Sequence, residues 1–373
     1  MWYALVPPQN RSICVSDNLR RYRAIKRALK QLYPKEPQGN LARHLDTLAG
    51  LISGIVGSKS TNLPHVASKV PDGRKVDSRV KRFTRWVSNA NIETEIYFLP
   101  YAQDLITSLA VRPLDLVMDG STVGRGCLAL LVSVVYQKRA LPLAWLVVKG
   151  RKGHFPETSH LTLLEHVHTM IPAHAQVTFL GDGEFDGIEL QDTLDTYGWC
   201  YVCRTAKNII LCRDGHEFAF ETIPLEPGTR FSLPQVTLRN QDYGPVHAIG
   251  WWGEGYDEPI YLLTNVADVD EACGWYRKRA RIETFFSDQK SRGFNLHKSH
   301  LSDPQRLARL MIAACLAYIW IIDLGIRALR DEWRSLIHRT TRCDLSLFQL
   351  GLRLLDHLLN EGKRIPVLFQ PSE

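Results

Sequence analysis

Three carboxylates, spread over the middle of the chain, are the side chains best suited to catalysis. Asp119 and Asp182 each follow a short apolar run, and each precedes a glycine that permits a sharp turn beside a bulky ligand. Glu283 lies later, in a segment with a helical pattern. Hard divalent cations such as Mg²⁺ prefer carboxylate oxygens, and two such cations can assist displacement at a phosphate. The plainer interpretation is that an Asp-Gly pair after a strand only forms a turn.

The segment around Glu283 carries three further polar groups at helical spacing. Tyr276, Arg279, Glu283 and Lys290 have offsets of 0, 3, 7 and 14 residues. At about 100° per residue they fall within roughly 60° of one another on a helix. One face would then carry a hydroxyl, a guanidinium, a carboxylate and an ammonium. The alternative is a solvated face on which Arg279 pairs with Glu283.

Apolar runs between these residues predict the elements that position them. Residues 114–118, 128–136 and 140–148 suit three antiparallel strands, because each run is short and bounded by polar residues. A helix at about 159–171, a strand at 177–180, a helix at 187–197 and a strand at 199–203 follow. This order is that of the ribonuclease-H-like fold. There the first and fourth strands lie side by side, so that Asp119 and Asp182 at their ends open into one crevice.

Beyond residue 205 the pattern changes twice. Residues 206–265 contain short alternating segments around Gly and Pro, which predict a β-rich insertion. A long helix is expected over about 268–290, and helices again from Asp303-Pro304 to about residue 362. The apolar run 310–322 is shorter than the roughly 20 residues of a membrane span, so it predicts a buried helix.

Charge distinguishes the first third of the chain from the rest. Residues 1–110 hold 17 basic and 8 acidic residues, a balance of +9, against −2 for the remainder of a chain whose total is +7. Helices are predicted at 17–33 with Asp17 as N-cap, at 40–56, at 64–70 and from Asp77 onward. Short helices with a basic last one are typical of a helix-turn-helix, so we predict DNA binding by the following residues. They are Arg79, Lys81, Arg82 and Arg85. A solvated basic helix surface is the alternative.

Taken together, these patterns predict an α/β protein with four parts. They are a helical, basic DNA-binding domain over 1–110 and a ribonuclease-H-like catalytic core over 111–205 and 266–300. A β-rich insertion over 206–265 and a C-terminal helical region over 301–373 complete the chain. The composition, 45% hydrophobic and 23% charged, excludes disorder for most of it. The scattered cysteines, Cys14 among them, and an N-terminus without a basic leader favour a reducing compartment, the cytoplasm, with no membrane partner.

The spacing of the polar helix face resembles a known signature. Tyr-x2-Arg-x3-Glu-x6-Lys is similar to the tetrad of DDE transposases of bacterial insertion sequences, in the insertion-sequence-four group named for it. Asp119-Gly-Ser and Gly181-Asp182-Gly-Glu-Phe-Asp resemble that family's first two acidic motifs. The resemblance covers roughly residues 111–300. The chain departs from the family at Gly183, where arginine is frequent.

The resemblance implies a reaction and a set of roles. Asp119, Asp182 and Glu283 would hold two Mg²⁺ ions, for which Mn²⁺ can substitute, with Asp119 bridging both. Tyr276, Arg279 and Lys290 would contact DNA phosphates. The enzyme would bind the terminal inverted repeats of its element as a dimer, cleave double-stranded DNA at the ends and join the 3′-OH to target DNA.

Two other functions stay open. One is a ribonuclease-H-like nuclease that cuts without joining, and the other is an inactive, domesticated DNA-binding protein. Among secondary candidates, Arg204, Lys207 and Asn208 could contact DNA, and Trp251, Trp252 and Tyr261 in the insertion could stack on a base, although core packing suits them better. Cys200 and Cys203 are expected to be structural thiols, and Glu184 and Asp186 to be caps.

Overall fold

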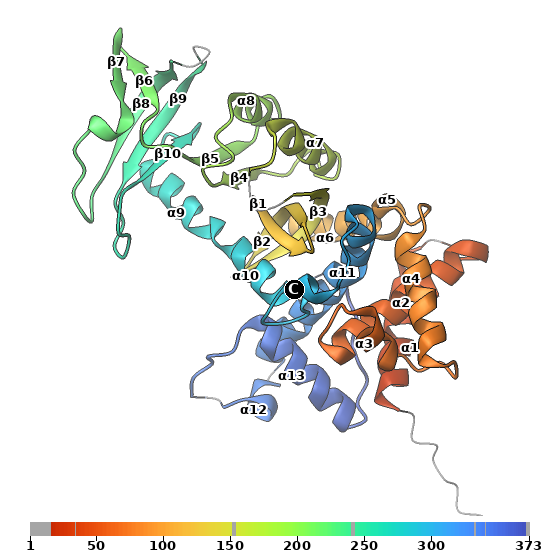
Figure 1. Cartoon of the computed structure of the whole chain (residues 1–373). Helices are drawn as coiled ribbons and strands as arrows, with labels where there is room; N and C mark the ends of the chain where they lie inside the picture. Colours follow the sequence, from red (N-terminus) through yellow and green to blue (C-terminus); the bar gives the residue numbers. More distant parts are fainter. Residues whose placement is uncertain are drawn as a thin grey trace, which may run out of the picture.

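The computed structural model describes residues 16–33, 35–150, 154–239, 243–331, 333–339 and 341–370. Cys14 and the N-terminal segment in which a leader was not expected lie outside these ranges. A single mixed sheet crosses the described part of the molecule, in the strand order β3-β2-β1-β4-β5-β10-β9-β8-β6-β7. Figure 1 shows a helical body at one end of this sheet and the strands β6 to β9 at the other.

The first half of the sheet has the predicted order. The three strands of the meander, and the two parallel strands that follow, are β1 (Leu114–Gly124), β2 (Cys127–Tyr136), β3 (Arg139–Lys149), β4 (Val177–Gly181) and β5 (Cys200–Thr205). β1 pairs antiparallel with β2 and parallel with β4, and β4 pairs parallel with β5. Helices α7 (Glu157–His168) and α8 (Ile188–Thr196) connect them. The prediction that the first and fourth strands are parallel neighbours is confirmed.

β1 is longer than its apolar run. The prediction that Asp119 ends the strand is wrong, because β1 continues to Gly124 and Asp119 lies opposite Leu131 of β2. The pairing with β4 stops earlier, at Val117 and Leu180. The long apolar run of β2 keeps β1 extended on one side, while on the other side β1 has no strand partner beyond Val117 among the described residues.

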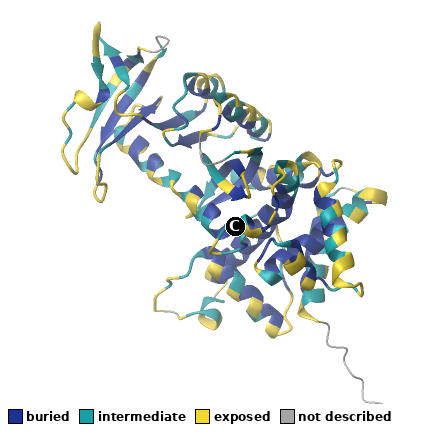
Figure 2. Ribbon diagram, viewed as in Figure 1, coloured by how far each residue is buried: buried dark blue, intermediate teal, exposed yellow. Residues whose placement is uncertain are grey.

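The insertion extends the sheet. Its strands are β6 (Ile210–Arg213), β7 (His216–Ala219), β8 (Arg230–Leu238), β9 (Tyr243–Trp251) and β10 (Ile260–Thr264), with a 3₁₀ turn at Phe220–Thr222. β10 pairs antiparallel with β5 of the catalytic half. A small core of its own includes Leu211, Phe220 and Val236, and Figure 2 shows buried residues along these strands as well as in the body. Strand β8 is irregular, with register shifts against β9 between Leu233 and Val236 and between Val236 and Leu238.

The long helix predicted over 268–290 is broken. It consists of α9 (Val269–Arg279) and α10 (Arg281–Gln289), which meet at Ala280. The Glu283 N–H donates to the carbonyl of Ala280, a tight i→i−3 turn. Neither Gly nor Pro stands there, so the sequence contains no local signal for the break. Tyr276 and Arg279 therefore lie on one helix, Glu283 on the next, and Lys290 just past its end.

The N-terminal and C-terminal helices pack together. The N-terminal set is α1 (Asp17–Gln31), α2 (Gly39–Ser58), α3 (Leu63–Ser68), α4 (Val76–Ser88), α5 (Thr94–Tyr97) and α6 (Leu99–Leu109). The C-terminal set is α11 (Pro304–Arg330), α12 (Arg334–Ile337) and α13 (Leu347–Asn360), after a 3₁₀ turn at Leu296–Lys298. The guanidinium of Arg20 donates to the carbonyls of Leu358 and Leu359 in the last turn of α13 and to that of Lys363 beyond it.

Helix α11 runs through the middle of this body. It is the one helix of the described residues that is long and apolar enough to cross a membrane, and 89% of its most apolar window is buried in the protein. The predicted buried helix over 310–322 is confirmed.

Two helix starts differ from prediction. Ser16, not Asp17, caps α1 by accepting from the Leu19 N–H, and α4 begins at Val76 after Lys75.

Candidate active site

The two aspartates lie at equivalent positions on neighbouring strands. β1 and β4 pair from Leu114 and Val177 to Val117 and Leu180, and two more residues along this register bring Asp119 level with Asp182. Paired strands are about 4.8 Å apart, so both side chains emerge at one place in the sheet. Backbone N–H groups orient them: the Asp119 carboxylate accepts from Gly120 at 2.7 Å and that of Asp182 from Glu184 at 3.1 Å.

Arg279 brings the third carboxylate to the same place. Its Nη2 lies 2.5 Å from Asp182 Oδ2 and 3.9 Å from Asp119 Oδ2, and its Nη1 lies 2.9 Å from Glu283 Oε1. One guanidinium thus contacts all three predicted catalytic residues. The sequence predicted the Arg279–Glu283 pair as the plain alternative and a DNA phosphate as the functional partner of Arg279. The structure pairs Arg279 with carboxylates from β1, β4 and α10.

Burial differs across this cluster. The side chains of Arg279 and Asp119 are 16% and 17% exposed, that of Asp182 is 29% exposed and that of Glu283 is 63% exposed. Burial raises the pKa of Asp119 to about 6, with the charge of Arg279 opposing the shift and Asp182 adding to it. Burial disfavours the charged form of Arg279, but the carboxylates of Asp182 and Asp119 outweigh it and raise the pKa of Arg279 above its ordinary value.

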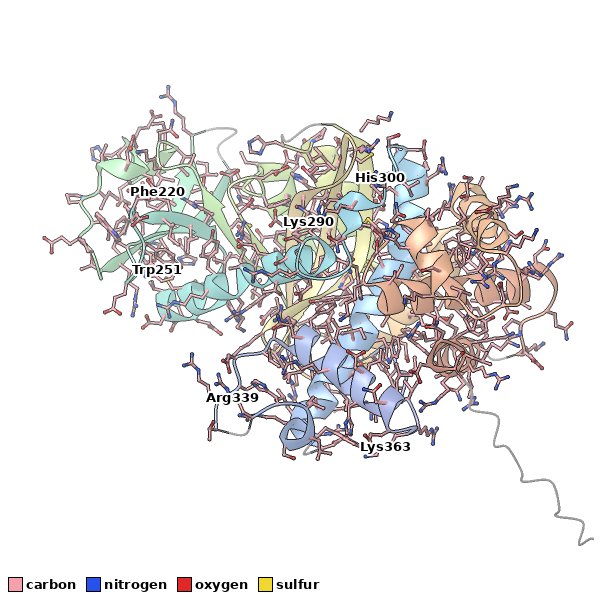
Figure 3. The ribbon with its side chains drawn as sticks, turned by 60° about the horizontal axis from the view of Figure 1, so that its bottom comes forward. Phe220, Trp251, Lys290, His300, Arg339 and Lys363 are labelled. Carbon is pink, nitrogen blue, oxygen red and sulfur yellow. The ribbon has the colours of Figure 1, made fainter. Side chains whose placement is uncertain are left out.

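Lys290 reaches the cluster from the end of α10. Its Nζ donates to Ser121 Oγ at 2.5 Å and lies 5.6 Å from the ring of Phe286. Burial lowers the pKa of Lys290, and the nearby charge of Asp119 opposes that shift. Figure 3 shows Lys290 near the centre of the molecule. Ser121 was missed as a functional residue, although its place two residues after Asp119 was a usable signal.

Tyr276 lies beside this cluster and is largely buried. It is 9% exposed, and burial raises its pKa to about 12 against the opposing charges of Arg279 and Arg204. Its helix is held to the sheet by an ion pair of 2.6 Å between Lys278 and Asp115 of β1. Arg279 is thereby presented from a fixed helix end.

The residues that follow Asp182 are structural, but they do not cap a helix as expected. The Glu184 carboxylate accepts from the Phe155 N–H and lies 3.5 Å from His160 Nε2. The Asp186 carboxylate accepts from the Thr205 hydroxyl at 2.6 Å. Both carboxylates tie loops to the core, so neither belongs to the Arg279 cluster.

The donor chemistry of the cluster suits a hard divalent cation, and its present spacing is the one that Arg279 imposes on the three carboxylates. Asp119, Asp182 and Glu283 supply only oxygen ligands. Among the described residues, however, no group of three or more His, Cys, Asp or Glu side chains lies close enough to hold a metal ion. The guanidinium of Arg279 lies in contact with all three carboxylates and balances part of their charge.

A second candidate site is a basic groove between α2 and α4. It has a volume of about 710 Å³, and its cationic lining residues are Arg43, Arg74, Lys81, Arg82 and Arg85. Trp86 and Asn89 line it as well. The sequence had not indicated Arg43 or Arg74, because both lie outside α4. A groove with five cations and no acidic lining residue is suited to a polyanion.

The predicted DNA-binding residues of α4 divide into two groups. Arg79 does not line the groove. It pairs with Asp72 at 2.5 Å and donates to the Ala67 carbonyl. Arg82 also pairs with Asp72, at 3.0 Å. Lys81 and Arg85 are exposed and form no ion pair within the described residues. The last two are therefore the better placed to meet a ligand.

Trp251 and Tyr261 of the insertion pack as core side chains, whereas Trp252 is only half-buried. Trp251 is 3% exposed, and Arg277 of α9 lies over its ring at 4.8 Å. The ring centroids of Tyr261 and Phe220 are 4.8 Å apart, and the Trp252 ring N–H donates to the Tyr256 carbonyl. Figure 3 places Phe220 and Trp251 together in this end of the molecule.

Arg204 within β5 and Lys207 just after it are paired within the protein. Arg204 lies 3.7 Å from Glu258, and Lys207 lies 3.6 Å from Glu221. Both acidic partners belong to the insertion. Contact of these two residues with DNA stays a prediction.

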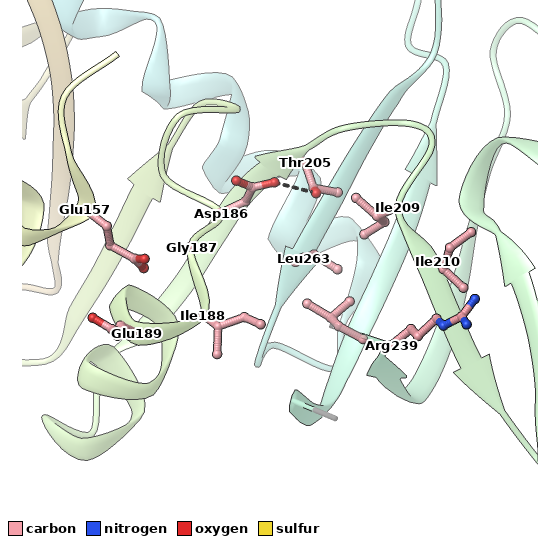
Figure 4. Close-up of a pocket in the computed structure, with 11 residues that line it drawn as sticks. Glu157, Asp186, Gly187, Ile188, Glu189, Thr205, Ile209, Ile210, Arg239 and Leu263 are labelled. Atoms are coloured by element: carbon pink, nitrogen blue, oxygen red, sulfur yellow. Dashed lines mark hydrogen bonds between the residues drawn. The ribbon is translucent and has the colours of Figure 1, made fainter. Parts of the chain in front are cut away.

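A pocket of about 620 Å³ separates α8 from the insertion (Figure 4). Glu157, Asp186 and Glu189 line one side, and the apolar side chains of Ile188, Ile209 and Leu263 are among those that line the rest. Thr205 faces this pocket, whereas its neighbour Arg204 is near Tyr276 of α9. Successive strand residues point to opposite faces, so the sheet separates the pocket from α9.

Known proteins resemble this chain in two ways. A protein family described as "Transposase DDE domain" matches residues 120–320, which is 201 of 373 residues and begins one residue after Asp119. Among solved structures, the piggyBac transposase in a cryo-EM synaptic complex with hairpin DNA is similar over 95% of this chain and 83% of that chain. That similarity has 13% sequence identity and a TM-score of 0.44. No curated protein matches the sequence.

Proposed function

The chain belongs to the transposase DDE domain family, and we propose that it cleaves DNA at the ends of a mobile element and joins the 3′-OH to target DNA. The observation that carries this proposal is the convergence of Asp119, Asp182 and Glu283 on one guanidinium. The three residues come from β1, the end of β4 and α10, so only a folded catalytic unit brings them together. The YREK spacing places the chain, in our proposal, in the insertion-sequence-four group.

We propose a ribonuclease-H-like core for this activity. The order β3-β2-β1-β4-β5, antiparallel for the first three strands and parallel for the next two, supports it. The carboxylates lie where the parallel strands β1 and β4 stop pairing, which is the usual position of a ligand in open α/β sheets. The β-rich insertion and the helical body would then hold DNA on either side of that position.

Asp119, Asp182 and Glu283 are the residues that would hold two divalent cations, Mg²⁺ or Mn²⁺. Bound there, the cations would supply Lewis acidity at the scissile phosphate. The protein itself contributes the remaining tasks. Lys290, fixed by Ser121, presents a cation beside Asp119, and buried Tyr276 supports the helix end that carries Arg279. Both cationic side chains suit phosphate oxygens.

The basic groove between α2 and α4 is the part that we propose binds the element ends. Lys81 and Arg85 on α4, with Arg43 and Arg74, would meet the DNA backbone. Arg79 supports the groove through Asp72 instead of contacting DNA. Because two ends must be cut together, we propose a dimer on DNA, acting in the cytoplasm where bacterial DNA lies.

The decisive experiment is a time course on DNA that carries the inverted repeats flanking the coding sequence. With Mg²⁺ present, nicked, fully cut and joined products should appear in that order. Products that stop at cleavage would favour a nuclease without joining activity. Binding without any cleavage would favour an inactive DNA-binding protein. Asp119→Asn provides the control, since it should bind the same DNA and cut none of it.

A further inference from the structure

The centre of the carboxylate cluster is occupied by the protein's own cation. We propose that Arg279 is an internal counter-ion that stabilises the three carboxylates while no divalent cation is bound, and that a DNA phosphate takes it over when the cation enters. The inference rests on the proposed function, because it concerns the same carboxylates. It adds that cation binding and DNA binding assist one another through this one side chain.

The contacts of Arg279 account for its role as a counter-ion. Two different nitrogens serve two carboxylates, with Nη2 2.5 Å from Asp182 and Nη1 2.9 Å from Glu283, and Asp119 lies within 4 Å of Nη2. Charge-assisted contacts of this length are the stronger hydrogen bonds of proteins. Three carboxylates crowded together without a cation would repel one another. The guanidinium therefore lowers the energy of the metal-free site, and the same contacts oppose an incoming divalent cation.

The guanidinium also retains a donor for another ligand. Its Nε is buried and forms no hydrogen bond within the described residues. A buried donor without a partner is costly, so an acceptor that reached Nε would be favoured. A phosphate can accept two parallel N–H bonds from a guanidinium, which three separate carboxylates do not match in shape. Arg279 is the last residue of α9, so its side chain extends from a helix end.

Exchange of partners couples the two ligands. A divalent cation must displace Arg279 from the carboxylates, and a phosphate stabilises the displaced guanidinium. Each ligand then improves binding of the other by the same factor, since coupling between two binding sites is reciprocal. The site would bind cations weakly in free protein and tightly when DNA is present.

Calorimetric titration of the full chain with Mn²⁺ tests the first half. We expect Arg279→Gln to bind Mn²⁺ at least about tenfold more tightly than the parent, since the competing hydrogen bonds are gone. Arg279→Lys keeps the positive charge but loses the planar set of guanidinium N–H donors. Its Mn²⁺ affinity should lie between those of the parent and Arg279→Gln. Arg281→Ala is the matched control, because it removes a positive charge two residues away and Arg281 forms no ion pair within the described residues. Unchanged or weaker binding by Arg279→Gln, or equal tightening by Arg281→Ala, would overturn the proposal.

The second half is tested by repeating the titration with a 40-base-pair duplex of arbitrary sequence at low ionic strength. The duplex should tighten Mn²⁺ binding to the parent several-fold and to Arg279→Gln much less. If the duplex changes the Mn²⁺ affinity of the parent and of Arg279→Gln by the same factor, or changes neither, the proposed coupling is overturned. Thermal unfolding of each variant without Mn²⁺ verifies that it is folded. If Asp119→Asn binds Mn²⁺ as tightly as the parent does, the proposed function is refuted instead. The two failures are therefore distinguishable.

Discussion

Two arginine–carboxylate contacts join the sheet to α10, and they differ in stoichiometry and burial. Arg139 at the start of β3 pairs with Asp288 of α10 at 3.0 Å, with side chains only 12% and 6% exposed. Arg279 faces three carboxylates, and one of them, Glu283, is 63% exposed. A dry one-to-one pair cannot exchange partners without leaving a buried charge unpaired. A cluster with excess carboxylate and access to solvent can exchange them, so similar chemistry serves structure in one place and ligand binding in the other.

The largest expected effect is on DNA cleavage, which should depend on the Arg279 cluster and not on the Arg139–Asp288 pair. Asp119→Asn should reduce DNA cleavage and joining by at least about a thousandfold, since the lost ligand removes several kcal/mol of transition-state stabilisation. Asp288→Asn should leave the rate per folded molecule within about tenfold of the parent. The measurement is the initial rate of strand cleavage with Mg²⁺, normalised to folded protein. Cleavage by Asp119→Asn near the parental rate would remove Asp119 from the active site.

Stability should show the reverse order. Replacing Asp288 by Asn leaves Arg139 buried without its partner and should cost about 3–5 kcal/mol of unfolding free energy. Replacing Arg279 by Gln should cost less, about 1–2 kcal/mol, because Asp182 and Glu283 retain access to water. Urea denaturation at pH 7 without divalent cations measures both. The double variant Arg139→Met and Asp288→Leu should lie close to the parent in stability, and a large loss there would mean that the pair is needed for more than its charge balance.

A pH titration of stability should sharpen the comparison. Burial raises the pKa of both Asp119 and Asp288 to about 6, above the ordinary value near 4. The folded state therefore binds these protons more tightly, and the resulting stabilisation is present below pH 4 and lost as the pH rises through 6. For each group the loss is up to about 3 kcal/mol.

Mn²⁺ should reverse the loss of stability that comes from Asp119 but not the loss that comes from Asp288. Mn²⁺ at pH 7 should restore stability to the parent and to Asp288→Asn, but little to Asp119→Asn, whose cation ligand is missing. Denaturation between pH 4 and 8, with and without Mn²⁺, provides the data. A pH dependence that is identical in Asp119→Asn and the parent would show that this carboxyl does not titrate near 6.

The smallest expected effect concerns an unpaired arginine of the basic groove, Arg85, and a paired arginine of the same helix outside the groove, Arg79. Arg85→Ala should lower the slope of log affinity for DNA against log salt by about 0.9, the value for one phosphate contact. Arg79→Ala should leave that slope unchanged and reduce stability instead, since Arg79 pairs with Asp72. Fluorescence anisotropy at several salt concentrations distinguishes them. Equal changes in slope would place both residues at the DNA.

Much of the catalytic half could be predicted from local pattern. Short apolar runs bounded by polar residues indicated β1, β2 and β3, and the element order indicated that β1 and β4 are neighbours, because few connections are possible in such a sheet. Burial of α11 followed from an apolar run too short to span a membrane. Strand β6 and the helices α5 and α6 were not predicted, since the four-residue elements β6 and α5 are too short to show a period and α6 begins with a proline in its first turn.

The sequence by itself determined which side chains are available and in what order the elements form. Carboxylates at 119, 182 and 283, a basic first third and the strand order all depend on residue type and short-range spacing. Only the tertiary structure decided the partners. It paired Arg279 with three carboxylates, tied Arg79 to Asp72, joined Lys290 to Ser121 and divided the expected long helix at Ala280. Periodicity specifies the face on which a residue lies, whereas the neighbour across that face comes from a distant segment and is chosen by packing and charge after the chain has folded.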